Sequence, residues 1–242
     1  MIHSLLSLQS VEQSGAGASP REKGLCNGIN PWLAPLAMVV SQDITLKLFF
    51  RQVVVLGQEH LPRSGPVLLA PTHRSRWDAL LLPHAAGRRV TGRDCRFMVT
   101  VDEMVGLQGW LLHRLGCFPV QQGSPSMASL RYPLDLLSGG QQLVVFPEGQ
   151  IQPQNSPLHL HQGLARLALM AAARGVTVTL LPVGIAYEHS PPRWGDRSAL
   201  CFAPPLAIGE GGRSAAIACT AQLAQAMQSA ESQAREALDI PA

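Results

Sequence analysis

The stretch Thr72-His73-Arg74-Ser75-Arg76-Trp77-Asp78 follows a short apolar run, Pro66-Val67-Leu68-Leu69-Ala70, which is typical of a β-strand. A histidine and an aspartate lie five positions apart where this run gives way to a polar turn. On one continuous helix that spacing rotates the two side chains about 140° apart, so they could not meet. With His73 in the turn and Asp78 in the first turn of a following helix, the carboxylate can fold back onto the imidazole. The pattern therefore predicts a histidine base that an aspartate orients.

The rest of the chain lacks the usual partners of a histidine base. There is no G-x-S-x-G elbow, and none of the five cysteines stands in a recognisable nucleophile context. We therefore expect the base to act directly on a substrate hydroxyl. The alternative is a surface histidine beside a helix N-terminal aspartate, a pairing that a short motif can produce by chance.

Composition narrows the class of protein. The chain has 242 residues, of which 46% are hydrophobic and 14% charged, and this suits a protein that rests on a membrane or handles apolar ligands, although a large core explains it nearly as well. Its 17 arginines and two lysines form no dense basic stripe, so no nucleic-acid partner is expected.

The five cysteines are odd in number and widely spaced, which indicates reduced thiols in a cytosolic compartment. His159-Leu160-His161 has no further ligand in register, so no metal site is predicted.

The first 50 residues divide into two segments. Residues 1–30 show no periodicity and read as a mobile tail, without the basic and apolar regions of a secretory signal. Residues 31–50 contain an apolar run of ten residues, too short for a bilayer core that needs about 20. We expect a helix or helix pair in the membrane interface, anchored by Trp32, Phe49 and Phe50. The alternative is a helix packed on the core of its own domain.

Strand-like and helix-like segments alternate from residue 51 onward, which predicts one α/β domain over residues 51–242. Arg88, Arg89, Arg93 and Arg96 form a basic cluster, either a landing site for an acidic carrier or anionic headgroups, or a solvated loop. Pro133 should kink or split the helix that contains it. The expected strands are residues 51–57, 66–70, 96–101, 117–120, 143–146 and 176–181, and the expected helices are residues 78–86, 102–115, 124–138, 163–174 and 214–238.

Four stretches, in order, carry a resemblance to a known family. The His-x4-Asp stretch at 72–78 resembles the first block of the glycerolipid acyltransferases, the family of 1-acylglycerol-3-phosphate acyltransferases. The three later blocks are similar to Gly116-Cys117-Phe118-Pro119-Val120, Val145-Phe146-Pro147-Glu148-Gly149 and Leu181-Pro182-Val183-Gly184-Ile185. The resemblance covers roughly residues 50 to 210. It implies an α/β fold in which helices flank one mixed β-sheet, with the amphipathic helix at 31–50 in front of it.

The resemblance also implies a reaction, in which a fatty acyl chain moves from acyl carrier protein or coenzyme A to a glycerolipid hydroxyl. The acceptor is expected to be 1-acylglycerol-3-phosphate, a lysophospholipid, and the product phosphatidic acid, at the cytoplasmic face of a membrane by peripheral or monotopic attachment. His73 would take the hydroxyl proton, and Asp78 would orient the imidazole of His73. No cofactor is expected. The residues expected to bind substrate are Arg74, Arg76, Phe118, Gln122, Phe146, Pro147, Glu148, Gly149 and Pro182, with Glu148 either contacting substrate or bracing its turn.

Two positions depart from the family pattern. Gln122 stands where the second block usually ends in arginine, and Gln150-Ile151 follows Glu148-Gly149 where the family usually has Thr-Arg. Glutamine can donate a hydrogen bond but brings no charge to a phosphate. Either nearby arginines (Arg74, Arg76, Arg114 or Arg166) replace the missing ones, or the acceptor is a neutral lipid alcohol. A hydrolase of acyl thioesters or lysolipids and an inactive binding relative are the other two readings.

Overall fold

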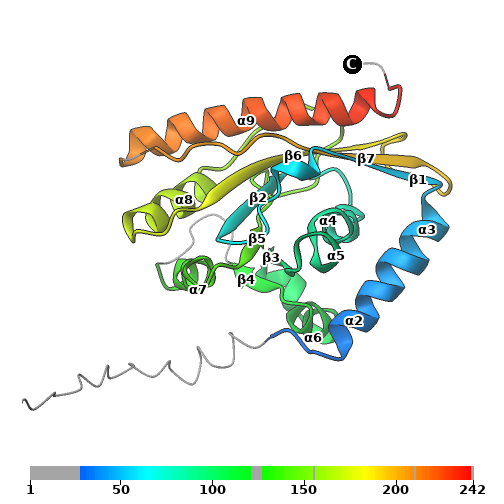
Figure 1. Cartoon of the computed structure of the whole chain (residues 1–242), viewed down its shortest axis with the longest axis horizontal. Coiled ribbons are helices and arrows are strands. Elements are labelled where there is room, and N and C mark those ends of the chain that lie inside the picture. Colours follow the sequence, from blue (N-terminus) through cyan, green and yellow to red (C-terminus); the bar gives the residue numbers. More distant parts are fainter. Residues whose placement is uncertain (1–27, 121–126, 155, 210, 241–242) are drawn as a thin grey trace, which may run out of the picture.

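One mixed sheet forms the centre of the protein (Figure 1). The structure is a computed structural model that describes residues 28–120, 127–154, 156–209 and 211–240. Within these residues seven strands pair in the order β1-β7-β6-β2-β5-β3-β4. The strands are β1 Gln52–Leu56, β2 Val67–Pro71, β3 Cys95–Thr100, β4 Phe118–Val120, β5 Gln142–Val144, β6 Thr179–Tyr187 and β7 Arg197–Phe202. The α/β fold with one mixed sheet, predicted from the sequence, is confirmed.

Strand directions bring two of the family blocks to one edge of the sheet. Strand β2 pairs in parallel with β5 on one side and with β6 on the other, and β7 then runs antiparallel to β6. The carboxyl ends of β2 and β5 therefore lie next to each other. The chain leaves β2 into Thr72-His73 and leaves β5 into Phe146-Pro147-Glu148. Such an edge is where open α/β sheets place their ligands.

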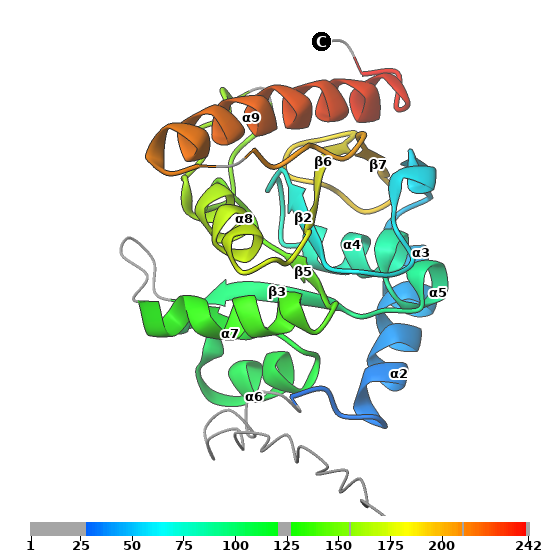
Figure 2. The ribbon, with the colours of Figure 1, turned by 60° about the vertical axis from the view of Figure 1, so that its left-hand side comes forward.

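Helices cover both faces of the sheet, because β2 is apolar on both sides. Val67 and Leu69 face one core with α4 Asp78–Ala86, whereas Leu68 and Ala70 face a second core with α8 Gly163–Ala173 and α9 Arg213–Glu236. Figures 1 and 2 show α9 lying along the sheet over β6. Three further helices are α5 Arg88–Thr91, α6 Gly106–Arg114 and α7 Met127–Ser138, with short 3-10 turns η2 Gln58–His60 and η3 Val101–Met104.

The segment expected in the membrane interface is helical. It consists of α2 Leu33–Met38, the π-helical η1 Val39–Thr45 and α3 Leu46–Phe49. Of its predicted anchors, Trp32 is 86% exposed, but Phe50 is only 3% exposed and belongs to the core, so Phe50 was wrongly assigned. Phe49 stacks on Trp77 with ring centroids 3.9 Å apart. The predicted tail lies largely outside the described residues, which begin at residue 28.

Four other local predictions need correction. The expected helix at 102–115 is broken at Val105, whose backbone is extended (φ −109°, ψ 145°). Helix α7 runs through Pro133 without splitting, since Leu134 and Leu137 anchor it in the core. Strand β6 continues through Pro182 to Tyr187, six residues beyond the predicted end at 181. Strand β7 was missed altogether.

Candidate active site

The catalytic pair predicted from the sequence is assembled in the structure. His73 lies in the turn after β2, and Asp78 is the first residue of α4. The Nδ1–H group of His73 donates to Oδ2 of Asp78 at 2.9 Å. Because a carboxylate only accepts, this bond fixes the neutral imidazole with its proton on Nδ1 and leaves Nε2 as the basic nitrogen. Phe146 stacks on the imidazole with ring centroids 3.9 Å apart.

Asp78 is completely buried, so its charge depends on hydrogen bonds from the protein. The backbone N–H groups of Arg74 and Ser75 donate to Oδ2 at 2.7 and 3.0 Å, beside the bond from His73. The hydroxyl of Tyr187 donates to Oδ1 at 2.5 Å. These bonds close the turn between β2 and α4 around the carboxylate. The ring orientation of His73 is therefore built into the backbone of the turn.

Arg74 has a different place from the one predicted. Its guanidinium is fully buried and donates to both oxygens of Glu231 on α9, at 2.6 and 2.8 Å. Its Nη1 donates to Glu148 at 2.9 Å. Burial would lower the pKa of Arg74, but the bonds to Glu231 and then Glu148 outweigh it and raise that pKa. The guanidinium of Arg74 is buried and bonded to two carboxylates of the protein itself, so the structure does not support the prediction that it binds substrate directly.

Glu148 lies in the segment that follows strand β5, and it holds the catalytic turn in place. One of its oxygens, Oε1, accepts the backbone N–H of His73 at 2.9 Å, and the side chain is almost fully buried. The next residue, Gly149, has φ +72°, which favours glycine, so the Glu148-Gly149 pair can turn sharply after β5. The backbone N–H of Gln152 then donates to the carbonyl of His73 at 2.8 Å. The bracing alternative for Glu148 fits this geometry better than direct contact with substrate.

Gly184 lets α9 approach closely enough for Glu231 to reach Arg74. A Cβ atom built on Gly184 would lie 2.0 Å from the backbone nitrogen of Glu231 and 2.2 Å from the carbonyl carbon of Ala230. Any side chain here would push α9 away from β6 and separate Glu231 from the guanidinium. The glycine of the fourth block therefore acts on the catalytic turn through helix packing.

The other predicted substrate-binding residues fall into two groups. Arg76 is exposed, and Phe146 and Gly149 are half-buried, with Phe146 against His73. Gln150, named only as a departure from the family pattern, is also exposed. Phe118 and Pro182 are buried inside the sheet and its core, and Pro147 is buried in the turn, so direct contact of these three with substrate is not supported. Gln122 lies outside the described residues.

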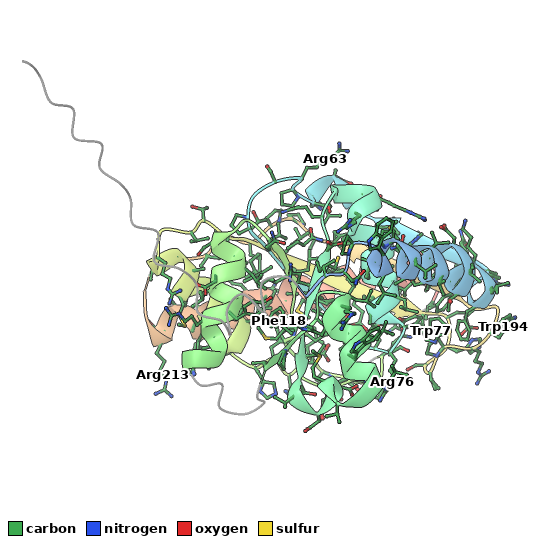
Figure 3. All side chains as sticks on the ribbon, turned by 90° about the horizontal axis from the view of Figure 1, so that it is seen from below. Arg63, Arg76, Trp77, Phe118, Trp194 and Arg213 are labelled. Carbon is green, nitrogen blue, oxygen red and sulfur yellow. The ribbon has the colours of Figure 1, made fainter. Side chains whose placement is uncertain are left out.

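Arg76 stands out among the arginines proposed to hold a phosphate. Within the part of the chain that the structure describes, its side chain has no hydrogen-bonding or ionic partner. It is exposed and extends from the catalytic turn next to Trp77 (Figure 3). Arg114 lies over the ring of Trp110 at 4.1 Å, and Arg166 donates to Gln162 on its own helix. Of the candidates, Arg76 alone combines a position in the catalytic turn with a guanidinium that faces solvent.

The basic cluster at 88–96 does not present a free positive surface. Arg88 forms an ion pair with Asp94, and Arg89 forms one with Asp43 of η1. Arg93 donates to the carbonyls of Gly65 and Pro62, and Arg96 is buried. These contacts fasten α5 and its loop to neighbouring segments. The interpretation as a landing site for an acidic carrier is therefore not supported.

The described cysteines do not offer a nucleophile. Cys95, Cys117, Cys201 and Cys219 are free and buried. Burial raises the pKa of Cys95 and of Cys117 to about 12, so neither thiol ionises near neutral pH. A covalent acyl-cysteine step at these residues has no chemical support.

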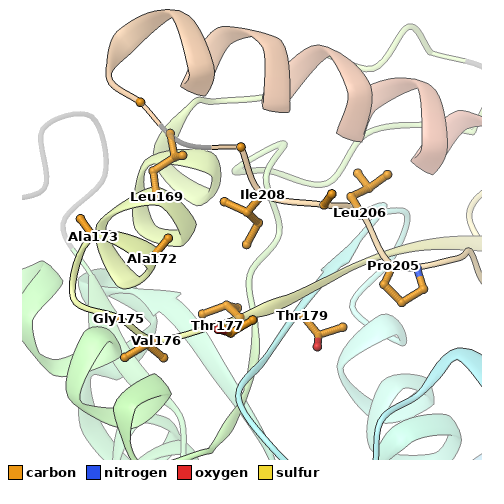
Figure 4. Close-up of a pocket in the computed structure, with 14 residues that line it drawn as sticks. Leu169, Ala172, Ala173, Gly175, Val176, Thr177, Thr179, Pro205, Leu206 and Ile208 are labelled. Carbon is orange, nitrogen blue, oxygen red and sulfur yellow. The ribbon is translucent and has the colours of Figure 1, made fainter.

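A pocket of about 820 Å³ lies at the opposite end of β6 from Tyr187 (Figure 4). It is lined by the end of α8, the start of β6 and the segment that leads to α9, including Leu169, Val176, Thr179 and Ile208. Its described lining contains no acid, base or thiol. The chemistry-bearing side chains and this pocket are therefore in different parts of the molecule.

Three comparisons with known proteins point to one family. The model of the Acyltransferase family matches residues 52–186. Over 115 residues, 47% of this chain, the sequence is 28% identical to 1-acyl-sn-glycerol-3-phosphate acyltransferase from Streptococcus pneumoniae (strain ATCC BAA-255 / R6), but the match spans only 40% of that relative. The fold is similar to the crystal structure of the 1-acyl-sn-glycerophosphate (LPA) acyltransferase, PlsC, from Thermotoga maritima. That match has a TM-score of 0.60 and 19% identity, and covers 90% of this chain and 84% of the other.

Proposed function

This chain belongs to the acyltransferase family, and on that premise we propose that it transfers a fatty acyl chain from an acyl thioester to the free hydroxyl of 1-acylglycerol-3-phosphate, which yields phosphatidic acid. The observation that carries the proposal is the bond between His73 and Asp78, which leaves the Nε2 nitrogen of a partly exposed imidazole as a base. The donor is an acyl-carrier-protein or coenzyme A thioester. The reaction is a step of phospholipid biosynthesis.

The geometry supports a direct mechanism. Nε2 of His73 takes the acceptor hydroxyl proton while the hydroxyl oxygen attacks the thioester carbonyl carbon, and Asp78 stabilises the imidazolium that forms. The tetrahedral intermediate collapses as the carbon–sulfur bond breaks. The departing thiolate then takes the proton from Nε2, so the enzyme returns to its starting state. Backbone N–H groups at a nearby turn are the expected donors to the oxyanion.

A panel of acceptors tests the proposal. Labelled acyl-carrier-protein and acyl-coenzyme A thioesters are incubated with lysophosphatidate, diacylglycerol or water alone, and the products are separated. Phosphatidate as the main product supports the proposal. Free fatty acid formed equally with and without an acceptor would identify a hydrolase with the same dyad, which is the second candidate because water could occupy the acceptor position.

Arg76 is the side chain that we expect to bind the acceptor phosphate. Arg76→Ala should raise the KM for lysophosphatidate about tenfold and change kcat much less, since a charge-assisted hydrogen bond is lost from the bound state. Steady-state kinetics across lysophosphatidate concentrations measures this. Arg166→Ala is the control, because Arg166 is exposed on α8 and bonded to Gln162. An unchanged KM in Arg76→Ala would remove this residue from the phosphate site.

We also propose that the protein attaches to the cytoplasmic face of a membrane as a peripheral or monotopic protein, with residues 31–50 in contact with lipid and residues 51–242 forming the catalytic domain. No helix among the described residues is long and apolar enough to cross a bilayer. Exposed apolar side chains follow one side of α2, η1 and α3 at intervals of about four residues: Trp32, Leu36, Val40, Ile44 and Leu48.

A second apolar surface lies on η3 and α6. Its exposed members are Val101, Val105, Leu107, Trp110 and Leu111. Helix α6 lies near α2 in Figure 1, and the backbone N–H of Asn30, just before α2, donates to the carbonyl of Arg114 at the end of α6 at 2.9 Å. The catalytic turn lies close to the first surface, because Trp77 stacks on Phe49 of α3. A lipid acceptor could thus reach His73 from the bilayer side.

Charged substitutions test the two surfaces. Leu36→Asp and Leu107→Asp should each weaken binding to phospholipid vesicles about tenfold or more, because an apolar side chain leaves the lipid interface. Leu107 is 81% exposed, so its replacement should leave the fold intact. Ile217→Asp, at an exposed apolar position on α9, is the matched control. Vesicle co-sedimentation measures binding, and equal binding by all three variants would contradict the proposal.

A further inference from the structure

The hydroxyl of Tyr187 occupies a position in the site that the His-x4-Asp pattern does not include. Tyr187 is the last residue of β6 and lies 109 positions after Asp78 in the sequence. Its hydroxyl donates to Oδ1 of Asp78 at 2.5 Å, whereas the bonds from His73, Arg74 and Ser75 all go to Oδ2. Within the described residues, Tyr187 is thus the one donor to the second carboxylate oxygen.

The surrounding contacts hold Tyr187 in place by both its backbone and its ring. The side-chain amide of Gln154 donates to the carbonyl of Tyr187 at 2.9 Å and accepts its N–H at 2.5 Å. The ring is buried and stacks on Phe50 with centroids 5.8 Å apart. Gln154 follows the Glu148-Gly149 turn, so the segment that braces His73 also fixes Tyr187. This double anchoring leaves the hydroxyl little freedom to point elsewhere.

Chemistry leaves only one direction for the hydrogen bond. Burial, and then the neighbouring Asp78, raise the pKa of Tyr187 well above its ordinary value, so the hydroxyl keeps its proton. The nearby Ser75 side chain acts in the opposite direction on this pKa but does not outweigh burial and Asp78. The proton of Tyr187 therefore points at Asp78. Of the other charged groups around this turn, Arg76 faces solvent, and the buried trio Arg74, Glu148 and Glu231 are already bonded to one another or to the turn.

We propose that Tyr187 is a positioning residue for acyl transfer: its hydroxyl holds the carboxylate of Asp78 in the one rotation that keeps Oδ2 on Nδ1 of His73. Without that bond, Oδ1 is a buried oxygen without a donor, and the carboxylate can rotate or recruit water. The imidazole then spends less time in the reactive tautomer and orientation. This inference rests on the proposed function of the same dyad.

Tyr187→Phe tests the proposal with the least structural change, because the ring and its contact with Phe50 remain. We expect kcat to fall about 10- to 100-fold while KM for donor and acceptor changes less than about twofold, the pattern of an interaction that matters in the transition state. In an Asp78→Asn background, Tyr187→Phe should lower kcat by no more than about twofold. A similar loss in both backgrounds, or a loss confined to KM, would overturn the proposal.

Ser198→Ala supplies a matched control. Ser198 is paired with Tyr187 across β6 and β7, and its buried hydroxyl has no partner within the described residues. Its removal should leave kcat unchanged, so a loss equal to that of Tyr187→Phe would point to general damage to the strand. Thermal unfolding of each variant shows whether it stays folded.

A readout that needs no activity separates failure of this inference from failure of the proposed function. In nitrogen-15 NMR of histidine-labelled protein, wild type should show His73 as the Nδ1–H tautomer with a strongly downfield proton. Tyr187→Phe should shift that proton upfield and speed its exchange, whereas Ser198→Ala should not. An unchanged His73 signal in Tyr187→Phe would sink the inference even if acyl transfer were never detected.

Discussion

His73→Ala should lower the rate of acyl transfer about 10²- to 10⁴-fold while the protein stays folded, the largest loss of activity that we expect from any single substitution. The imidazole is partly exposed and contacts mainly Phe146 and Asp78, so few packing contacts are lost. Single-turnover transfer from a labelled thioester, alongside circular dichroism, measures rate and fold together. Added imidazole should restore part of the activity, because it can enter the vacated space and act as the base.

Asp78→Asn should reduce turnover over a similar range, by favouring the wrong imidazole tautomer. Asn is the better choice than Ala here, because Ala would leave the backbone N–H groups of Arg74 and Ser75 without their acceptor. His159→Ala is the control for loss of a histidine, since His159 is an exposed loop residue. Should His73→Ala keep most of its activity without added imidazole, the proposed mechanism is wrong.

The dyad could be predicted from the sequence because all of its parts are local. His73 and Asp78 lie within one seven-residue stretch between a strand and a helix, and the spacing alone requires a turn that brings them together. Strands β1 to β6 could be predicted for the same reason, since they are short apolar runs separated by turn residues, whereas β7 was missed. Helix α9 was also predicted, at residues 214–238, and an apolar stripe along it is buried: Ala216, Leu223, Met227, Ala230 and Ala234.

The support around the dyad could not be predicted, because its partners are far apart in the sequence. Tyr187 and Glu231 reach the turn from 109 and 157 positions away. Arg74 looked like a phosphate ligand because nothing local shows that two carboxylates neutralise it. One signal was available: Glu231 is an acidic residue next to Ala230 inside the otherwise apolar stripe of α9, and buried acids in proteins are paired.

The solvent exposure of apolar side chains could not be predicted from the sequence pattern either. Leu107 and Leu111 are four positions apart, the spacing of one face of an amphipathic helix, which is equally compatible with a core and with a lipid surface. The break at Val105 and the close packing of Gly109 on the backbone of Met104 turn these side chains outward. Only the tertiary arrangement distinguishes the two outcomes.

Glu231→Ala should lower the free energy of unfolding by about 3–5 kcal/mol, the largest loss of stability that we expect, because it removes the main partner of a fully buried arginine. Glu148 would remain as the one acid bonded to Arg74, and it also holds the N–H of His73. We therefore expect kcat to fall in the fraction that stays folded, even though Glu231 lies on a helix outside the region that the family model matches. Urea unfolding followed by circular dichroism measures the stability change.

Asp94→Ala provides the matched comparison, because it breaks a bidentate arginine–carboxylate pair at the surface. Arg88 of that pair is 44% exposed, so water replaces the lost partner and the cost should stay below about 1 kcal/mol. The contrast between the two variants isolates burial as the cause, since both remove a carboxylate that binds one guanidinium by two hydrogen bonds. If Glu231→Ala proved no more costly than Asp94→Ala, α9 could not be anchoring the catalytic turn through Arg74. The close approach that Gly184 allows would then serve packing alone.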